Sequence, residues 1–370
     1  MLLCEPVEDI DELVEPLRAF RFTLRDALRH ALLYMTAYDG EADAIERRLG
    51  GRQLLEYFDT QPRLFDHAPN AADLAFDTVQ AGDQRLLLRW VQHTALYVTL
   101  EIGVSYPVGS IFDKGAGPPL IVIPGVQGRW EWVRPALDHL QSRCRTISYS
   151  LCGDLGSACT QDPARGFDNY LDQLDRVFET AGVERAALCG ISYGGFIALR
   201  YAASRPERVS ALAIVSSPAP GWTPNPIQSA YIASPLRATP RFIFSSPVRL
   251  WPEIRAAFAA PMDRVSFILQ HGLRVAAAPM NPTLMAGRIA QQQQMDFCPD
   301  CARVRVPALI VTGEPELDKV VPVESTRRYV DMIPGARYAL MERTGHLGLV
   351  TQPGKFAALV GNFVREYGVT

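Results

Sequence analysis

The sequence of 370 residues contains little lysine, little cysteine and no long uncharged apolar run. Only three of its 37 basic residues are lysines, and the arginines form no stripe that could neutralise a phosphate backbone, so we expect no nucleic-acid partner. The most apolar window, residues 90–108, still contains Glu101 and other polar residues, so we predict no membrane span. Hydrophobic residues make up 48% and charged residues 21%, a composition typical of globular proteins.

The seven cysteines show no regular spacing, and an odd number fits a reducing compartment better than a disulfide scaffold. A chain of this length also buries enough surface to fold without disulfides or a metal ion. The first residues, MLLCEPVEDIDEL, carry acids where an export signal needs an apolar stretch. We therefore expect a cytoplasmic protein.

The first 80 residues have the pattern of helices. Apolar side chains recur there at helical spacing, namely Leu13, Val14, Leu17, Leu24, Leu28 and Leu32. Such a stripe is typical of a helix packed on a core. A dimer interface, and hence a homodimer, or a lid over a pocket are the alternatives.

The pattern changes near residue 85. Residues 86–88 and 97–104 indicate strands, and apolar runs then alternate with helical segments, at 120–123, 146–149, 186–189, 211–215, 308–311 and 337–341. Strands that are apolar throughout are covered on both faces, so the sequence predicts an α/β fold with a doubly wound, mostly parallel sheet.

No strand is apparent between Pro218 and Val304. We predict a helical extension at 1–80, a core at 81–217 and 305–370, and a helical cap inserted at 218–304. Such a cap would lie over the carboxyl ends of the strands, where open parallel sheets bind ligands.

The segment Gly190-Ile191-Ser192-Tyr193-Gly194 stands between the apolar run 186–189 and a helical pattern at 196–203. A strand that turns directly into a helix is sharp, and glycines relieve the crowding. Such a turn holds its central residue in a strained conformation above the sheet. We predict that Ser192 is a nucleophile.

A serine hydroxyl needs a base within hydrogen-bond reach, and the imidazolium that forms needs a buried carboxylate. His346, in a glycine-containing segment after the last strand, is the predicted base; the other histidines are predicted surface or core residues (30, 67, 93, 139 and 271). Asp318 follows the strand 308–311 and is the predicted acid, with Glu314 and Glu316 as alternatives.

The turn Pro124-Gly125-Val126-Gln127-Gly128 directly follows the strand 120–123. A glycine turn here can leave a backbone N–H pointing at the reaction centre, so we assign an oxyanion hole to the N–H groups of Val126 and Tyr193. Trp130 and Trp132 follow this turn and are typical packing residues. Trp130 and Trp222 are the candidate substrate contacts.

These residues together resemble the α/β-hydrolase family, in its serine esterase and lipase-like branch, over residues 85–217 and 305–370. The resemblance implies eight mostly parallel strands, a helical cap after the sixth strand, and triad roles for Ser192, Asp318 and His346. Two features depart from it: Pro124 stands where the family usually has histidine, and the first 80 residues exceed what the fold needs. Serine at the nucleophile position disfavours the branches that use aspartate, the haloalkane dehalogenases and epoxide hydrolases.

The predicted activity is hydrolysis of a small carboxylic ester through an acyl-Ser192 intermediate, without cofactor or metal. Cys298-x-x-Cys301 lacks the second ligand pair that a zinc site needs. Aromatic residues in the cap predict an apolar pocket for the substrate: Trp222, Tyr231, Phe242, Phe244, Trp251, Phe258 and Phe267. The same triad would also serve a carbon–carbon bond hydrolase, a lactonase or an acyltransferase, and a binding protein without turnover is a further alternative.

Overall fold

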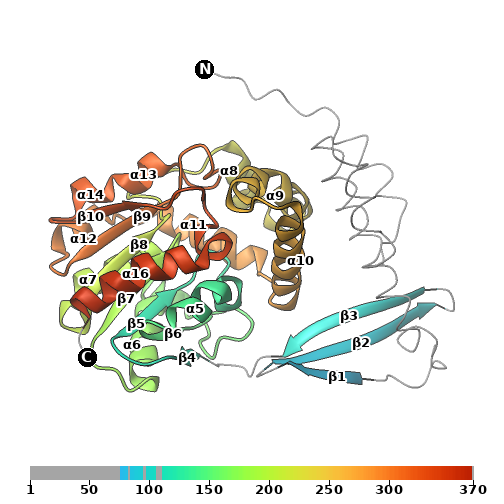
Figure 1. The fold of residues 1–370 in the computed structure, drawn as a ribbon. Helices are drawn as coiled ribbons and strands as arrows, with labels where there is room; N and C mark the ends of the chain where they lie inside the picture. Colours follow the sequence, from blue (N-terminus) through green and yellow to red (C-terminus); the bar gives the residue numbers. More distant parts are fainter. Residues whose placement is uncertain (1–75, 82–83, 95–96, 106–110, 369–370) are drawn as a thin grey trace. The chain divides into compact units, whose positions relative to one another are not determined.

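The computed structural model describes residues 76–81, 84–94, 97–105 and 111–368 (Figure 1). The chain divides into two compact units, residues 1–105 and 106–370. Most of the predicted N-terminal helical extension lies outside the described residues. Its last residues form strand β1 (Phe76–Ala81), so the helical prediction was wrong there. The physical reason is pairing: β1 runs antiparallel to the following strand in unbroken register.

The first unit contains a three-stranded antiparallel sheet in the order β1-β2-β3, with β2 at Gln84–Thr94 and β3 at Tyr97–Ser105. Both strands predicted in this region are confirmed. We expected them to belong to the core, but they pair with β1 and with each other in a sheet of their own. Strands that are close in sequence pair locally because closing a short loop costs little entropy.

The second unit is built on a seven-stranded sheet in the order β10-β9-β8-β7-β5-β6-β4. Every neighbouring pair is parallel except β4 with β6. The strands are β4 (Phe112–Lys114), β5 (Pro119–Ile123), β6 (Arg145–Ser148), β7 (Ala186–Ile191), β8 (Val209–Val215), β9 (Ala308–Thr312) and β10 (Arg337–Leu340). The six predicted strands of this sheet are confirmed. Within the described residues the sheet has seven strands, one fewer than the family resemblance implied.

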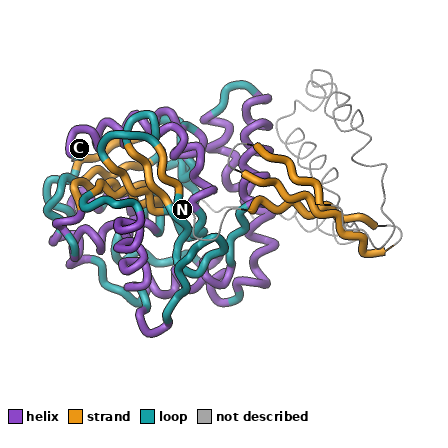
Figure 2. Tube along the Cα trace, turned by 90° about the horizontal axis from the view of Figure 1, so that it is seen from below, coloured by secondary structure: helices purple, strands orange, loops and turns teal. Residues whose placement is uncertain are grey.

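Helices cover both faces of this sheet (Figure 2). Successive residues of β5 alternate between two cores, with Ile121 and Ile123 in one and Leu120 and Val122 in the other. This is the alternation that a strand buried on both faces requires. The covering helices and short 3-10 turns are η2 (Trp130–Val133), α5 (Arg134–Leu140), η3 (Pro163–Arg165), α6 (Asp168–Thr180), α7 (Gly194–Ser204), η4 (Pro206–Arg208), α13 (Val323–Arg327), α14 (Tyr329–Met332), α15 (Gly348–Thr351) and α16 (Pro353–Tyr367).

Between β8 and β9 the chain forms helices and no strand, and residues 216–307 are all described. These helices are α8 (Pro226–Ala233), α9 (Pro235–Ala257), α10 (Pro261–Ala277), α11 (Pro282–Gln293) and α12 (Cys298–Arg303). Helices α8 to α11 gather at one end of the unit (Figure 1), and we call them the cap. In the described part of the chain, no helix is both long and apolar enough to cross a bilayer.

Cys152 and Cys159 form a disulfide in the segment that follows β6. The irregular cysteine spacing led us to expect no disulfides, and that expectation was wrong for this pair. The two residues are seven positions apart, and a compact turn brings their Cα atoms to 4.7 Å. A spacing argument that looks for a framework across the chain does not detect a pair closed within one turn. The other cysteines among the described residues are free: Cys144, Cys189, Cys298 and Cys301.

Candidate active site

Ser192 lies at a sharp turn between β7 and α7, with a φ of 51° that is unusual for a residue other than glycine. Its N–H donates to the Val215 carbonyl at 2.8 Å, and its carbonyl accepts from the Gly195 N–H at 2.9 Å. A Cβ atom at Gly190 would stand 2.4 Å from the Gly194 carbonyl oxygen, and one at Gly194 would stand 2.5 Å from the Ile123 oxygen. The turn therefore requires glycine on both sides of the serine.

Asp318 and His346 are brought together from the segments that follow β9 and β10. The Nδ1 atom of His346 lies 3.2 Å from Oδ2 of Asp318, and both side chains are buried. The other carboxylate oxygen of Asp318, Oδ1, accepts from the N–H groups of Val320 and Val321, each at 2.9 Å. These bonds orient the carboxylate, which in turn holds the proton of the imidazole on Nδ1 and leaves Nε2 as the basic nitrogen.

The two alternative acids do not contact His346 among the described residues. Glu314 accepts the backbone N–H of Arg343 at 2.7 Å through Oε1, and Glu316 is exposed. Asp318 is thus the acid of this loop that pairs with the histidine.

Charges around His346 favour the imidazolium. Burial lowers the pKa of His346, and Arg249 lowers it further, but the Asp318 carboxylate and Glu253 together outweigh both. The pKa of His346 is therefore raised above its usual 6.5. A raised pKa makes the neutral imidazole a better proton acceptor.

The sheet order places Ser192 and His346 at the same edge. At this edge, hydrogen bonds join the ends of neighbouring strands. The Ser192 N–H donates to the Val215 carbonyl, the Ser216 N–H to the Val311 carbonyl and the Met341 N–H to the Thr312 carbonyl. Among the described residues, no hydrogen bond joins the Ser192 hydroxyl to the His346 imidazole. The structure thus forms the acid–base pair and leaves the contact between nucleophile and base unmade.

The turn predicted to form the oxyanion hole closes with a bond from Gly128 N–H to the Gly125 carbonyl at 2.9 Å. It lies beside the nucleophile, since a Cβ atom at Gly125 would stand 3.4 Å from the Cβ of Ser192. Within the described part of the chain, neither Val126 N–H nor Tyr193 N–H donates to a protein group. Both N–H groups are therefore available to a ligand.

Arg288 of α11 reaches from the cap to this turn, a contact that we did not predict. Its guanidinium donates to the Val126 carbonyl at 2.9 Å and pairs with the buried Asp154 carboxylate. It also donates to the Tyr170 hydroxyl at 3.2 Å and to the Cys152 carbonyl at 3.3 Å. Burial opposes its charge, but Asp154 raises the pKa of Arg288, which stays cationic. No sequence motif marks an arginine in a helix as the brace of a distant turn.

Neither tryptophan proposed as a substrate contact bonds to the Ser192, Asp318 or His346 side chains in the described structure. Trp130 is buried in one of the two cores, with its ring centroid 5.5 Å from that of Phe112. Trp222 is partly exposed after β8, and its carbonyl accepts from Gln293 at 3.2 Å.

Apolar cap residues do lie beside the oxyanion turn. Tyr231 and Phe242 pack with ring centroids 5.3 Å apart, in a cluster that also contains Met285 and Val126. Nothing is described for the Phe244 side chain. The cap thus presents an apolar surface next to one of the predicted oxyanion donors.

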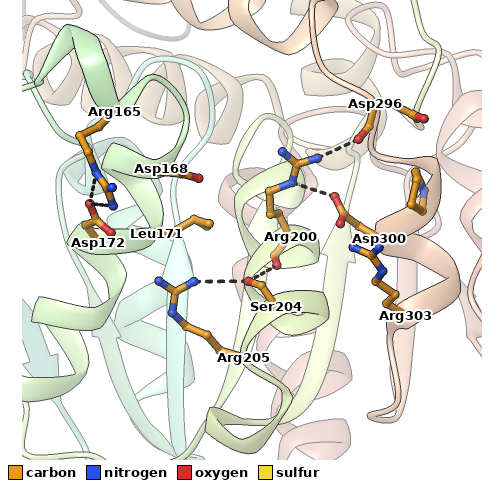
Figure 3. Close-up of a pocket in the computed structure, with 11 residues that line it drawn as sticks. Arg165, Asp168, Leu171, Asp172, Arg200, Ser204, Arg205, Asp296, Asp300 and Arg303 are labelled. Carbon is orange, nitrogen blue, oxygen red and sulfur yellow. Dashed lines mark hydrogen bonds and ion pairs between the residues drawn. The ribbon is translucent and has the colours of Figure 1, made fainter.

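A charged pocket of about 510 Å³ opens elsewhere in the unit (Figure 3). Arg200 and Ser204 of α7 line it, roughly 9 and 15 Å beyond Gly194 along the helix, so it does not include the nucleophile. Arg200 bonds Asp300 at 2.8 Å and the Asp296 carbonyl at 2.7 Å. The rest of its lining is Arg165, Asp168, Leu171, Asp172, Arg205, Pro299 and Arg303.

Within the described residues, no group of three or more histidine, cysteine, aspartate or glutamate side chains could hold a metal ion. Cys298 and Cys301 are free thiols at the start of α12.

A model of the alpha/beta hydrolase family matches residues 120–359, well over half of the chain. The chain belongs to the alpha/beta hydrolase family. This hydrolase is 25% identical over 256 residues to RutD of Azorhizobium caulinodans, for which carbamate hydrolysis is the assumed activity; the match covers 68% of this chain and 93% of that protein. RutD of Klebsiella pneumoniae strain 342 is 26% identical over 253 residues, which are 66% of this chain and 90% of that protein.

Solved structures share the fold of this hydrolase. An esterase from Exiguobacterium antarcticum superposes with a TM-score of 0.57 at 20% identity, covering 79% of this chain and all of the esterase. The enol-lactonase from Burkholderia xenovorans superposes with a TM-score of 0.56 at 19% identity, over 69% of this chain and 95% of the lactonase. These likenesses establish the fold and leave the substrate open.

Proposed function

We propose that this hydrolase cleaves a carboxylic ester through an acyl-Ser192 intermediate, with His346 as general base and Asp318 as its orienting acid. The observation that carries this proposal is the buried Asp318–His346 pair at 3.2 Å on the same sheet edge as a strained serine. The Asp318 side chain is 1% exposed, whereas the carboxylate of a solvated loop would be in water.

In this mechanism, Ser192 Oγ attacks the carbonyl carbon of the ester while its proton passes to Nε2 of His346. The imidazolium is stabilised by the Asp318 carboxylate and then gives the proton to the departing alcohol. Water, deprotonated by the same imidazole, attacks the acyl group and releases the acid. The serine–histidine contact forms when substrate is bound, because catalytic hydrogen bonds are often long in free enzymes.

The tetrahedral intermediate carries a negative charge on the former carbonyl oxygen. We assign the N–H groups of Val126 and Tyr193 as hydrogen-bond donors to this oxygen. Two observations support the assignment: among the described residues neither N–H has a protein acceptor, and both lie beside Ser192. Preorganised donors of this kind typically contribute the largest electrostatic term in acyl transfer. The backbone supplies the donor whether histidine or proline precedes Gly125.

The apolar cluster of Tyr231, Phe242 and Met285 beside Val126 favours an ester with an apolar group. Carbamate hydrolysis is the second candidate, because the RutD relatives align along nearly their whole length. A carbamate carbonyl would use the same nucleophile, base and oxyanion donors.

The test uses p-nitrophenyl esters of increasing acyl length, matched carbamates and a lactone, together with labelling by a fluorophosphonate. Wild-type protein should hydrolyse at least one ester and acquire one covalent adduct on Ser192. Ser192→Ala should lose both the adduct and about 10⁴-fold or more in kcat. Turnover of carbamates alone would favour the second candidate. Labelling and turnover that persist in Ser192→Ala would refute the mechanism.

A further inference from the structure

Glu253 of cap helix α9 is a carboxylate that the proposed mechanism does not use. It is 0% exposed and is the only acidic residue of that 23-residue helix. It forms no ion pair with any described residue. Burying a carboxylate without a cation costs free energy unless hydrogen bonds satisfy its oxygens. The hydrogen-bond partners of Glu253 therefore indicate its role.

Both carboxylate oxygens of Glu253 bond to the segment that carries His346. Oε2 accepts from the Leu347 N–H at 2.9 Å, directly after the histidine, and Oε1 accepts from the Thr351 hydroxyl at 3.3 Å. On the other side of the histidine, a Cβ atom at Gly345 would stand 2.8 Å from Glu253 Oε2 and 2.4 Å from the Leu317 carbonyl oxygen. Glycine is required there because the backbone passes between two elements.

This contact places the His346 backbone between the cap and the loop that carries Asp318. Leu317 directly precedes Asp318, so one side of the histidine segment abuts the loop that orients the imidazole. The other side is bonded to α9. A shift of α9 would therefore move the imidazole relative to Asp318 and to the sheet edge.

We propose that Glu253 is a positioning residue for His346. Through Glu253, the position of cap helix α9 determines the position of the His346 imidazole. This inference rests on the proposed function for its effect on turnover, although the contact itself is independent of turnover. Glu253 touches no reacting atom and acts through the backbone on either side of the histidine.

The negative charge of Glu253 has a second effect. The groups that act on the imidazole are Asp318 and Glu253, which both raise the pKa of His346, and Arg249, which lowers it. The pKa of Glu253 is raised by burial, and the backbone bonds from residues 345 and 347 oppose that shift. Replacing Glu253 by glutamine keeps an acceptor for Leu347 and removes the charge, whereas leucine removes both.

The experiment compares wild type, Glu253→Gln and Glu253→Leu, with Asp263→Asn as a matched control on the exposed surface of cap helix α10. Two measurements do not depend on turnover: NMR titration of the His346 Cε1 proton, assigned with His346→Gln, and hydrogen exchange of the Leu347 amide. Kinetics on an active ester then separate kcat from KM.

We expect Glu253→Gln to lower the pKa of His346, because a negative charge that favours the imidazolium is removed, with the Leu347 amide still protected. Glu253→Leu should expose that amide to exchange and lower kcat about 10- to 100-fold with little change in KM, as a misplaced catalytic group does. Asp263→Asn should leave all of these unchanged. The unfolding midpoints of both Glu253 variants are measured so that a loss of fold is recognised.

Leu347 protection and the pKa of His346 that match wild type in folded Glu253→Leu would overturn the proposal. So would an increase in KM without a change in kcat. If the wild type hydrolyses no ester, the proposed function fails, while the NMR and exchange measurements still decide whether Glu253 positions His346.

Discussion

Truncating Arg288 is the perturbation whose cost the structure defines most directly. In Arg288→Met, Asp154 would remain buried without its counterion, and the carbonyls of Val126 and Cys152 would lose a donor. The side chains of Arg288 and Asp154 are each 1% exposed, so water cannot replace the lost bonds. Removing one partner of a buried ion pair costs about 3–5 kcal/mol, a large share of the roughly 5–15 kcal/mol that stabilises a typical domain.

The ion pair between Arg165 and Asp172 is the matched control. Its side chains are 50% and 32% exposed, so Arg165→Met should cost no more than about 1 kcal/mol. A second comparison removes both buried charges at once. Arg288→Met with Asp154→Leu should recover much of the lost stability, since the penalty comes chiefly from the orphaned carboxylate.

The assay is urea unfolding followed by tryptophan fluorescence at one pH and salt concentration. It compares wild type, the single variants Arg288→Met, Asp154→Leu and Arg165→Met, and the double variant. A loss below about 1 kcal/mol for Arg288→Met would refute the reasoning, as would a double variant whose loss equals the sum of the single ones. Ester turnover of the folded Arg288→Met protein should also fall, because the Val126 peptide loses the bond that orients it.

Two further predictions concern pH. Asp318→Asn removes the negative charge that raises the pKa of His346, so the acid limb of the pH profile of kcat/KM should move to lower pH. The value of kcat should fall about 10²- to 10⁴-fold. An acid limb that does not move in a folded variant would contradict the assignment of Asp318 as the partner of His346. Burial and Arg274 lower the pKa of His271 to about 4. Because the unfolded chain takes up this proton below about pH 6.5 and the folded protein does not, stability should fall between pH 6.5 and 4, by on the order of 1–2 kcal/mol at pH 5. His271→Gln should reduce that loss in urea unfolding at pH 7.5 and 5, and exposed His139→Gln should leave it as in wild type.

The sheet and the serine turn could be predicted from sequence because local physics decides them. Runs such as 120–123 and 186–189 are apolar on every residue, which a strand buried on both faces requires. Gly190 and Gly194 flank Ser192 because backbone carbonyls occupy the space that a Cβ atom would need. The placing of His346 and of an acid within 314–318 could be predicted in the same way, since both segments follow a strand whose carboxyl end lies at the edge where Ser192 stands.

The contacts that join the cap to the site could not be predicted from sequence. Glu253 lies 94 residues before Leu347 in the chain, and Arg288 lies 162 residues after Val126. An acid or an arginine in an amphipathic helix is normally solvated, and no local pattern distinguishes these two from their exposed neighbours. The separate β1-β2-β3 sheet and the Cys152–Cys159 disulfide were mispredicted for a different reason. Both form between segments close in sequence, which an analysis of patterns across the whole chain does not detect.

The amino-acid sequence by itself determined the strands, the strained serine turn and the residue types that the chemistry needs, because propensity, apolar periodicity and backbone crowding act over a few residues. Tertiary structure alone decided that Asp318, and neither Glu314 nor Glu316, pairs with His346. It also decided that Glu253 of the cap bonds the segment that carries His346, and that Arg288 of the cap bonds the turn at Val126. Those choices depend on which groups lose water together when distant segments pack, a property of the folded chain that short sequence patterns do not contain.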